Sequence, residues 1–225
     1  MIISHKHKFI FVKTKKTAGT SIEIALSNLC GKKDILTPIA DEDEFQRIEE
    51  KIYPRNYKIG FQDFKIADLK ELIKKGFKYK RRHKYSNHST AQQIQKHIDA
   101  KIWDSYFKFC FERHPFDKAI SAYNYHMKFS NQELSFEDFL KSNDFYKNFH
   151  RYSIDDKIAV NFVGKYETLQ DDFDHILRQI GIDKTILLPK SKISNKRREP
   201  LISVESKEII IKKCKMEFKY LGYEY

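Results

Sequence analysis

The 225-residue chain has few of the residues that interrupt regular structure, only 7 Gly and 5 Pro. This scarcity excludes collagen-like, linker-rich and low-complexity architectures. Its three cysteines, Cys30, Cys110 and Cys214, lie far apart, so neither a disulfide framework nor a thiolate zinc site is encoded. No apolar run approaches the roughly 20 residues that span a bilayer, and the basic start lacks the apolar core of a signal peptide. We therefore expect a cytoplasmic protein in a reducing compartment, without a transmembrane segment.

The composition describes a folded, basic protein. Hydrophobic residues make up 40% and aromatic residues 14% of the chain, which is enough apolar surface to build a core. No Pro/Gly/Ser-rich linker or repeat divides the sequence, so we expect a single domain over residues 1–225. The 43 Lys and Arg against 31 Asp and Glu give a net charge of +12. An anionic partner is expected, and composition alone does not choose among nucleic acid, an acidic membrane, a polyanionic substrate and a nucleotide.

Three segments follow one pattern, in which a short apolar run is followed by a polar loop and then by a helical repeat. The apolar runs are residues 9–12, 107–111 and 162–166. Helices are expected from Ser21, from Pro115 and from a cap formed by Thr168 with Asp171. Strands that alternate with helices predict an α/β fold with a mainly parallel sheet. A helical, charge-dense insertion is expected over residues 41–102, and a further helix over residues 209–218.

The loop after the first strand has the character of an anion cradle. It contains Lys16, Thr17, Ala18, Gly19, Thr20 and Ser21. Backbone N–H groups and the positive end of the following helix face such an anion, while Gly19 allows close approach of the backbone and Lys16 adds a charge. The nucleotide-binding pattern G-x-x-x-x-G-K-[ST] is absent, which disfavours an ordinary kinase or NTPase.

Residues 16–21 resemble the 5′-phosphosulfate loop of sulfotransferases that use 3′-phosphoadenylyl sulfate (PAPS). Residues 113–123 resemble the same family's 3′-phosphate motif, with Arg113 and Ser121 eight residues apart. The resemblance implies a three-layer, P-loop NTPase-like sulfotransferase fold in one domain. It also implies that Arg113 presents its planar fork to the ribose 3′-phosphate and that Ser121 donates a hydroxyl hydrogen bond to it.

Weaker resemblances add further candidate residues. Tyr166 lies in a segment similar to the family's V-G-x-Y-E, and Asn195, Lys196 and Arg197 look like its basic loop that closes over the cofactor. The segment Asn87 to Ala91 resembles the H-x-[ST]-A of carbohydrate (Golgi-type, family 2) members. It places His88 before a helix that we expect Ser89 to cap with Gln92, where a helix N-terminus keeps an imidazole neutral and able to accept a proton.

The resemblance thus implies in-line transfer of a sulfuryl group from PAPS to an acceptor hydroxyl, with adenosine 3′,5′-bisphosphate (PAP) as product. Lys16 stabilises the leaving phosphate oxygen, His88 accepts the proton, and no metal is needed. The His88 segment favours a carbohydrate acceptor, and a small phenol, a lipid head group and a peptide tyrosine stay open as alternatives. The basic chain is compatible with an anionic acceptor. Two positions depart from the family's pattern. Lys15 adds charge near the phosphosulfate, and Glu112 is either a second acid/base group or an internal partner of Arg113.

A different class of function is open at this stage. Residues 74–84 interleave Lys and Arg with Phe and Tyr, which is also typical of a nucleic-acid-binding module. The same stretch is compatible with an anionic glycan acceptor bound by an enzyme.

Overall fold

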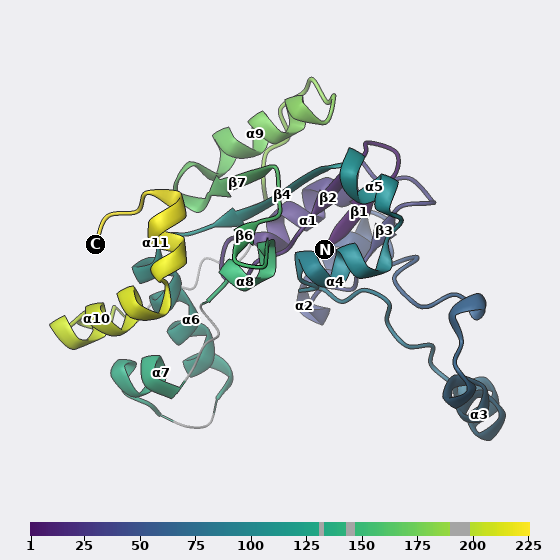
Figure 1. Ribbon diagram of the computed structural model, residues 1–225, viewed down its shortest axis with the longest axis horizontal. Helices are drawn as coiled ribbons and strands as arrows, with labels where there is room; N and C mark the ends of the chain where they lie inside the picture. The colour runs from purple at the N-terminus through teal and green to yellow at the C-terminus, as the bar shows by residue number, and fades with distance from the viewer. Residues whose placement is uncertain (131–132, 143–146, 190–198) are drawn as a thin grey trace.

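A five-stranded sheet forms the centre of the computed structural model, which describes residues 1–130, 133–142, 147–189 and 199–225. The strands lie in the order β3 (Ile35–Leu36), β1 (Ile2–Ser4), β2 (Phe9–Phe11), β4 (Phe107–Glu112) and β7 (Phe162–Lys165) (Figure 1). Strand β1 is antiparallel to both of its neighbours, whereas β2, β4 and β7 run parallel. The predicted α/β fold with a mainly parallel sheet is confirmed.

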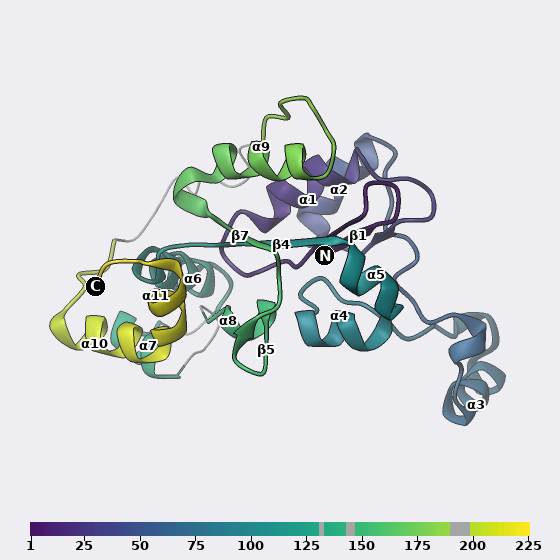
Figure 2. The same cartoon turned by 45° about the horizontal axis from the view of Figure 1, so that its top comes forward.

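Helices cover both faces of the sheet, giving three layers (Figure 2). On one face, α1 (Gly19–Ser27) and α9 (Leu169–Gln179) pack on Phe9, Phe11 and Phe109. On the other face, α4 (Ala91–His97), α5 (Ala100–Ser105) and α8 (Phe149–Tyr152) pack on Ile10 and Cys110. Strands β2 and β4 are therefore buried on both faces, which fits the continuous apolar run of β2. In β4 the buried Lys108 interrupts the apolar residues, and its Nζ donates to Trp103 O at 2.7 Å.

Close packing of β4 against β7 depends on a glycine. Gly164 pairs with Phe111, and a Cβ atom at this position would lie 2.6 Å from the Phe111 ring. No other residue leaves room for that ring. The parallel pair therefore holds its two carboxyl ends, Glu112 and Lys165, directly opposite each other.

A second group of helices packs beside the sheet. It comprises α6 (Pro115–Phe129), α7 (Phe136–Ser142), α10 (Val204–Lys213) and α11 (Lys215–Leu221). Pro115 occupies the first turn of α6, as predicted. The helix predicted over residues 209–218 is wrong as a single element, because Cys214 leaves helical geometry (φ −112°, ψ 26°) and separates α10 from α11. The break turns Glu217 and Phe218 into the core.

The insertion contains α2 (Asp41–Glu49), η1 (Phe61–Asp63), α3 (Ile66–Lys75) and η2 (Gly76–Lys78). Residues 57–84, here called the arm, carry α3 away from the sheet in both Figure 1 and Figure 2. Backbone hydrogen bonds close its base, from Lys84 N to Tyr57 O (2.8 Å) and from Ile59 N to Arg82 O (3.0 Å). A short hairpin of β5 (Ser153–Ile154) and β6 (Lys157–Ile158) follows α8, and η3 (Tyr166–Thr168) follows β7.

Both predicted helix caps are wrong in detail. Helix α4 is capped by Thr90, whose hydroxyl accepts from Gln93 N, one residue later than the predicted pair of Ser89 and Gln92. The Ser89 hydroxyl instead accepts from Ser86 N at 2.8 Å. Thr168 precedes α9 but makes no cap bond. Its hydroxyl donates to the Asp172 carboxylate at 2.9 Å.

Across the described parts of the chain, no helix has both the length and the apolar character needed to cross a membrane.

Candidate active site

The loop between β2 and α1 has a strained backbone. Lys16 (φ 63°) and Ala18 (φ 58°) both lie in the left-handed region, which costs a non-glycine residue about 1–3 kcal/mol. Side-chain contacts hold this conformation, since the Thr14 hydroxyl donates to Phe111 O and lies 2.8 Å from the Thr17 hydroxyl. Left-handed residues followed by a helix N-terminus direct backbone N–H groups into one concavity, which suits an anion.

Gly19 has a packing role in this loop beside the predicted approach to an anion, which stays a prediction. A Cβ atom on Gly19 would lie 2.9 Å from Cγ of Lys13. The glycine therefore makes room for the Lys13 side chain, whose Nζ forms a buried ion pair with Glu23 Oε2 at 2.5 Å. The same Nζ lies 3.4 Å from the Thr20 hydroxyl. Lys16 Nζ lies 4.4 Å from the ring centroid of Tyr125 on α6.

Arg113 follows the carboxyl end of β4. It lies at the same end of the sheet as the loop after β2, because β2 and β4 are adjacent and parallel. Its guanidinium carbon lies 4.2 Å from the ring centroid of Tyr166, which follows β7. The ring fixes the plane of the guanidinium. Ser121 lies two turns into α6 and is half-buried. The structure thus brings the Lys16 loop, Arg113 and Tyr166 to the carboxyl ends of three neighbouring strands.

Glu112 is an internal partner and not a second acid/base group. Its side chain is fully buried. Its Oε1 accepts hydrogen bonds from Lys118 Nζ (2.7 Å), Arg113 N (3.0 Å) and Asn148 Nδ2 (3.2 Å). Burial raises the pKa of Glu112, and the ion pair with Lys118 opposes that rise. The carboxylate therefore fixes the start of the Arg113 segment from behind.

Asn148 joins the loop between β2 and α1 to the segment that begins at Glu112, and sequence reasoning did not identify it. Its amide makes reciprocal hydrogen bonds with Lys15, from Lys15 N to Oδ1 and from Nδ2 to Lys15 O, both 2.9 Å long. The same amide donates to Glu112, and the Asn148 backbone N–H donates to Glu217 Oε1 at 3.1 Å. One buried side chain therefore sets the position of the loop relative to Arg113. No motif surrounds Asn148 in the sequence.

His88 lies against the loop. Its Nδ1 is 3.1 Å from Lys13 O. Because a carbonyl only accepts, Nδ1 carries the proton and the Nε2 lone pair of the neutral ring is left to act as a base. Burial and the charge of Lys13 lower the pKa of His88 to about 3. These causes keep the ring neutral at pH 7, in the same direction as the predicted effect of a helix N-terminus, which stays a prediction.

Arg151, on α8, completes a group of cations that the sequence did not reveal. Its Nη1 donates to His88 O at 2.8 Å. Burial, followed by the charge of Arg151, lowers the pKa of Lys15. Among the residues that the structure describes, the buried Arg151 Nε has no hydrogen-bond partner. Lys15 and Arg151 are two cations that repel each other, and the buried Nε of Arg151 is a hydrogen-bond donor still to be satisfied within the described residues. An anion between them would relieve both costs.

Comparison with known proteins is consistent with this geometry. A family model described as the sulfotransferase family matches residues 1–224. The chain belongs to the sulfotransferase family. It is 37% identical over 102 residues to an uncharacterized protein of Archaeoglobus fulgidus, which covers 43% of this chain and 85% of that protein. No solved structure matches the chain. Family membership supports sulfotransfer as the general activity.

The Lys16 loop, Arg113 and Tyr166 resemble motifs of sulfotransferases and lie at the carboxyl ends of β2, β4 and β7. The basic loop of the same resemblance lies outside the described residues. The side chains of Thr17 and Thr20 contact Thr14 and Lys13, so the loop's backbone amides are its main anion donors. Ser21 is buried at the start of α1. The predicted basic loop of Asn195, Lys196 and Arg197 lies outside the described residues, and its role stays a prediction.

Proposed function

We propose that this sulfotransferase-family protein moves a sulfuryl group from PAPS to a hydroxyl of a carbohydrate acceptor and releases PAP. The observation that carries the proposal is the pairing of two phosphate-type motifs at adjacent parallel strand ends, joined by Asn148 and facing His88. A nucleotide with phosphates at both ends of its ribose needs two anion sites at a fixed separation. A single-phosphate ligand does not.

The 5′ side of the donor would lie on the loop. The backbone amides of Thr17 to Ser21 and the N-terminus of α1 would bind the 5′-phosphate. Lys16 would leave the Tyr125 ring for the bridging oxygen, where negative charge develops as the S–O bond breaks. Lys15 and Arg151 would supply positive charge on the flank nearest His88, where the sulfuryl oxygens need it.

The 3′ side would lie on Arg113, with Ser121 as a second donor. Arg113 is only 6% exposed, and its stacking on Tyr166 limits the rotamers of its side chain. A guanidinium held in this way binds phosphate with little loss of entropy. Asn195, Lys196 and Arg197 are proposed to close over the nucleotide.

His88 would act as the general base. Its Nε2 would take the proton of the acceptor hydroxyl while the hydroxyl oxygen attacks sulfur and the 5′-phosphate oxygen leaves with the electron pair. A base with a pKa of about 3 is weak. Negative charge from bound PAPS would offset the Lys13 and Arg151 charges and raise the pKa of His88 toward neutrality, so base strength would follow donor binding. The resemblance of the His88 segment to carbohydrate-type members supports the choice of acceptor.

The test combines binding and turnover. PAP should raise the melting temperature and ATP should not, because ATP lacks the 3′-phosphate that Arg113 would hold. With labelled PAPS and a panel of glycans, Lys16→Ala should abolish measurable transfer. His88→Ala should lower transfer about 10²- to 10⁴-fold with PAP binding unchanged. Equal stabilisation by ATP and PAP, or full transfer by Lys16→Ala, would contradict the proposal.

A further inference from the structure

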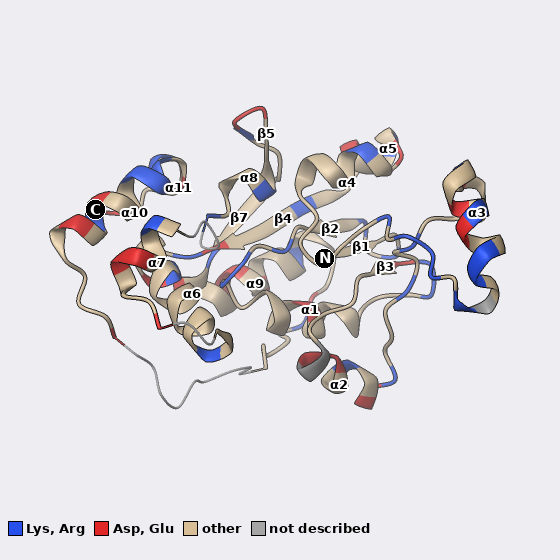
Figure 3. Cartoon of the chain, turned by 90° about the horizontal axis from the view of Figure 1, so that it is seen from below, with Lys and Arg blue, Asp and Glu red and all other residues tan. Residues whose placement is uncertain are grey.

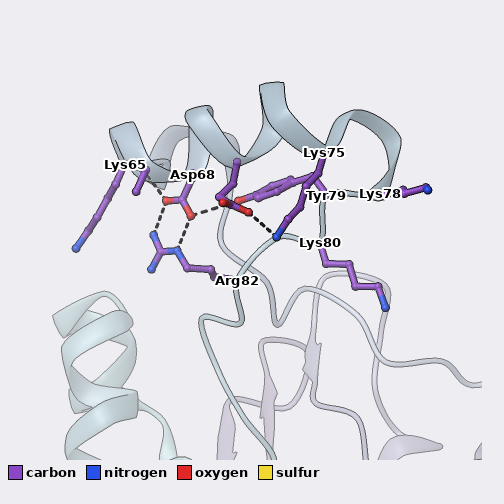
Figure 4. A pocket seen from close by; sticks show the side chains of 9 residues that line it. Lys65, Asp68, Lys75, Lys78, Tyr79, Lys80 and Arg82 are labelled. Carbon is purple, nitrogen blue, oxygen red and sulfur yellow. Dashed lines mark hydrogen bonds and ion pairs between the residues drawn. The ribbon is translucent and has the colours of Figure 1, made fainter.

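Helix α3 has its charged face turned inward. Asp68 is only 4% exposed and accepts two hydrogen bonds from Arg82, at 2.5 and 2.6 Å, and one from the Tyr79 hydroxyl at 3.2 Å (Figure 4). The Arg82 hydrogen bonds hold the pKa of Asp68 below its usual range. Glu71 and Lys75 form an ion pair on the same side. This inner side faces a cavity of about 550 Å³ with a mostly charged lining, so the polar surface of α3 lies against the rest of the arm.

The outer face of α3 is apolar. Ile66, Leu69 and Ile73 are 75%, 48% and 84% exposed. Their i, i+3, i+7 spacing places them in one stripe along the helix. At about 100° per residue, Lys70 and Lys74 border this stripe on one side. A surface helix of a water-soluble protein normally has the reverse arrangement, so the stripe indicates a surface that docks on something else.

The arm also carries most of the chain's excess charge. Residues 57–84 contain ten Lys and Arg but three Asp and Glu, so this segment has a net charge of +7 out of +12 for the whole chain. Figure 3 shows the Lys and Arg along α3 and the segment that follows it. Phe61, 70% exposed, adds an aromatic ring just before α3. The charge, the apolar stripe and the projection away from the sheet coincide in one segment.

We propose that the arm docks on an anionic membrane surface, with α3 parallel to the membrane plane. The apolar stripe would reach the boundary between headgroups and acyl chains, and the flanking lysines would meet the lipid phosphates. With ten residues, α3 is about 15 Å long and too short to cross a hydrocarbon core of about 30 Å.

Two other occupants fit less well. A second copy of the chain would bring two arms of charge +7 together, which is unfavourable. A nucleic acid would match the charge and would find one exposed ring, Phe61, but the stripe along α3 is aliphatic and offers the bases no further ring to stack on. An anionic bilayer is complementary to both the charge and the aliphatic stripe.

The test is sedimentation of the full chain with phosphatidylcholine vesicles, with and without phosphatidylserine. Binding should require phosphatidylserine and weaken with salt. Ile66→Ser with Ile73→Ser should weaken binding at least about tenfold, because two apolar side chains lose their membrane contact. Lys70→Gln with Lys74→Gln should weaken it about tenfold or more, because two headgroup charges are lost. The matched control is Leu201→Ser with Val204→Ser, at aliphatic positions 91% and 74% exposed outside the arm, and it should bind like the wild type.

Circular dichroism melting of each variant separates lost docking from lost folding, and the lysine pair keeps the test valid if the isoleucine pair unfolds. Four results would overturn the proposal: no vesicle binding, equal binding to neutral vesicles, binding unaffected by either pair, or an oligomer in solution that the isoleucine pair disrupts. Tight oligonucleotide binding that survives Ile66→Ser with Ile73→Ser would assign the arm to nucleic acid instead. None of these readouts depends on sulfate transfer, so this proposal and the proposed function can fail separately.

Discussion

At the scale of single residues, His88 shows how one backbone contact fixes the tautomer of an imidazole. The Lys13 carbonyl fixes the proton on Nδ1, and burial with the nearby Lys13 and Arg151 charges keeps the ring neutral. Since the folded-state pKa lies below the unfolded value of about 6.5, the unfolded chain binds a proton first as the pH falls. His88 therefore lowers the free energy of unfolding between about pH 6.5 and pH 3, and does not affect it above that window.

We predict that nuclear magnetic resonance titration of the free protein gives His88 a pKa of about 3, and that saturating PAP raises it by at least one unit. The physical reason is that bound phosphates offset the two neighbouring cations. The variant His88→Gln assigns the signal and should also remove part of the loss of stability below pH 6.5. A free-protein pKa near 6.5, or no change on adding PAP, would contradict this account of the base.

At the scale of elements, the loop between β2 and α1 depends on α8, which is distant in sequence. Asn148 begins that helix and pairs with both backbone groups of Lys15. The loop has left-handed residues that are not glycine, so an external contact is needed to keep its shape.

Replacing Asn148 with Ala should weaken PAP binding about tenfold or more, because the loop amides lose their alignment and the Lys15 backbone groups lose their partners. Isothermal titration with PAP measures the dissociation constant, and thermal melting measures the accompanying loss of stability. Asn28→Ala, at an exposed position after α1, is the control and should leave both nearly unchanged. An unchanged dissociation constant in a destabilised Asn148→Ala protein would limit Asn148 to a structural role.

At the scale of the whole molecule, a buried ion cluster joins the sheet to the C-terminal helices. Lys118 on α6 lies 2.7 Å from Glu112 at the end of β4 and 3.5 Å from Glu217 on α11. Burial lowers the pKa of Lys118, but Glu112 and Glu217 raise it by more, so the net shift is upward and the ammonium stays charged.

Lys118→Ala should lower the free energy of unfolding at pH 7 by about 3–5 kcal/mol, because it leaves two carboxylates buried without their cation. Urea denaturation measures the change. Lys141→Ala removes an exposed pair with Glu205 of the same 2.7 Å length and should cost less than about 1 kcal/mol. Similar losses in the two variants would show that the buried cluster does not hold the helices to the sheet.

The parts of this fold that were predictable depend on local pattern. Buried strands at residues 9–12, 107–111 and 162–166 have apolar runs, and Pro115 begins a helix, since both signals lie within a few residues of the feature they indicate. Strand β1 was not predicted because another strand follows it, without the helical repeat that marked the predicted strands. Strand β3 was not predicted because its two residues carry too little pattern to distinguish a strand from a loop. The cap at Thr90 was missed because Ser89 and Thr90 are chemically equivalent candidates.

The sequence by itself determined the α/β class, the family motifs and the excess of positive charge, because each is a property of residue type and spacing. Only the tertiary structure decided that Asn148 joins the Lys15 loop to Glu112, that Lys13 and Arg151 adjoin His88, and that α3 presents its isoleucines outward. Those facts depend on contacts between residues 36 to 133 positions apart, or on which helix face meets the rest of the chain. The local sequence specifies neither kind of fact. It determines which residues share a helix face, but not which part of the chain that face packs against.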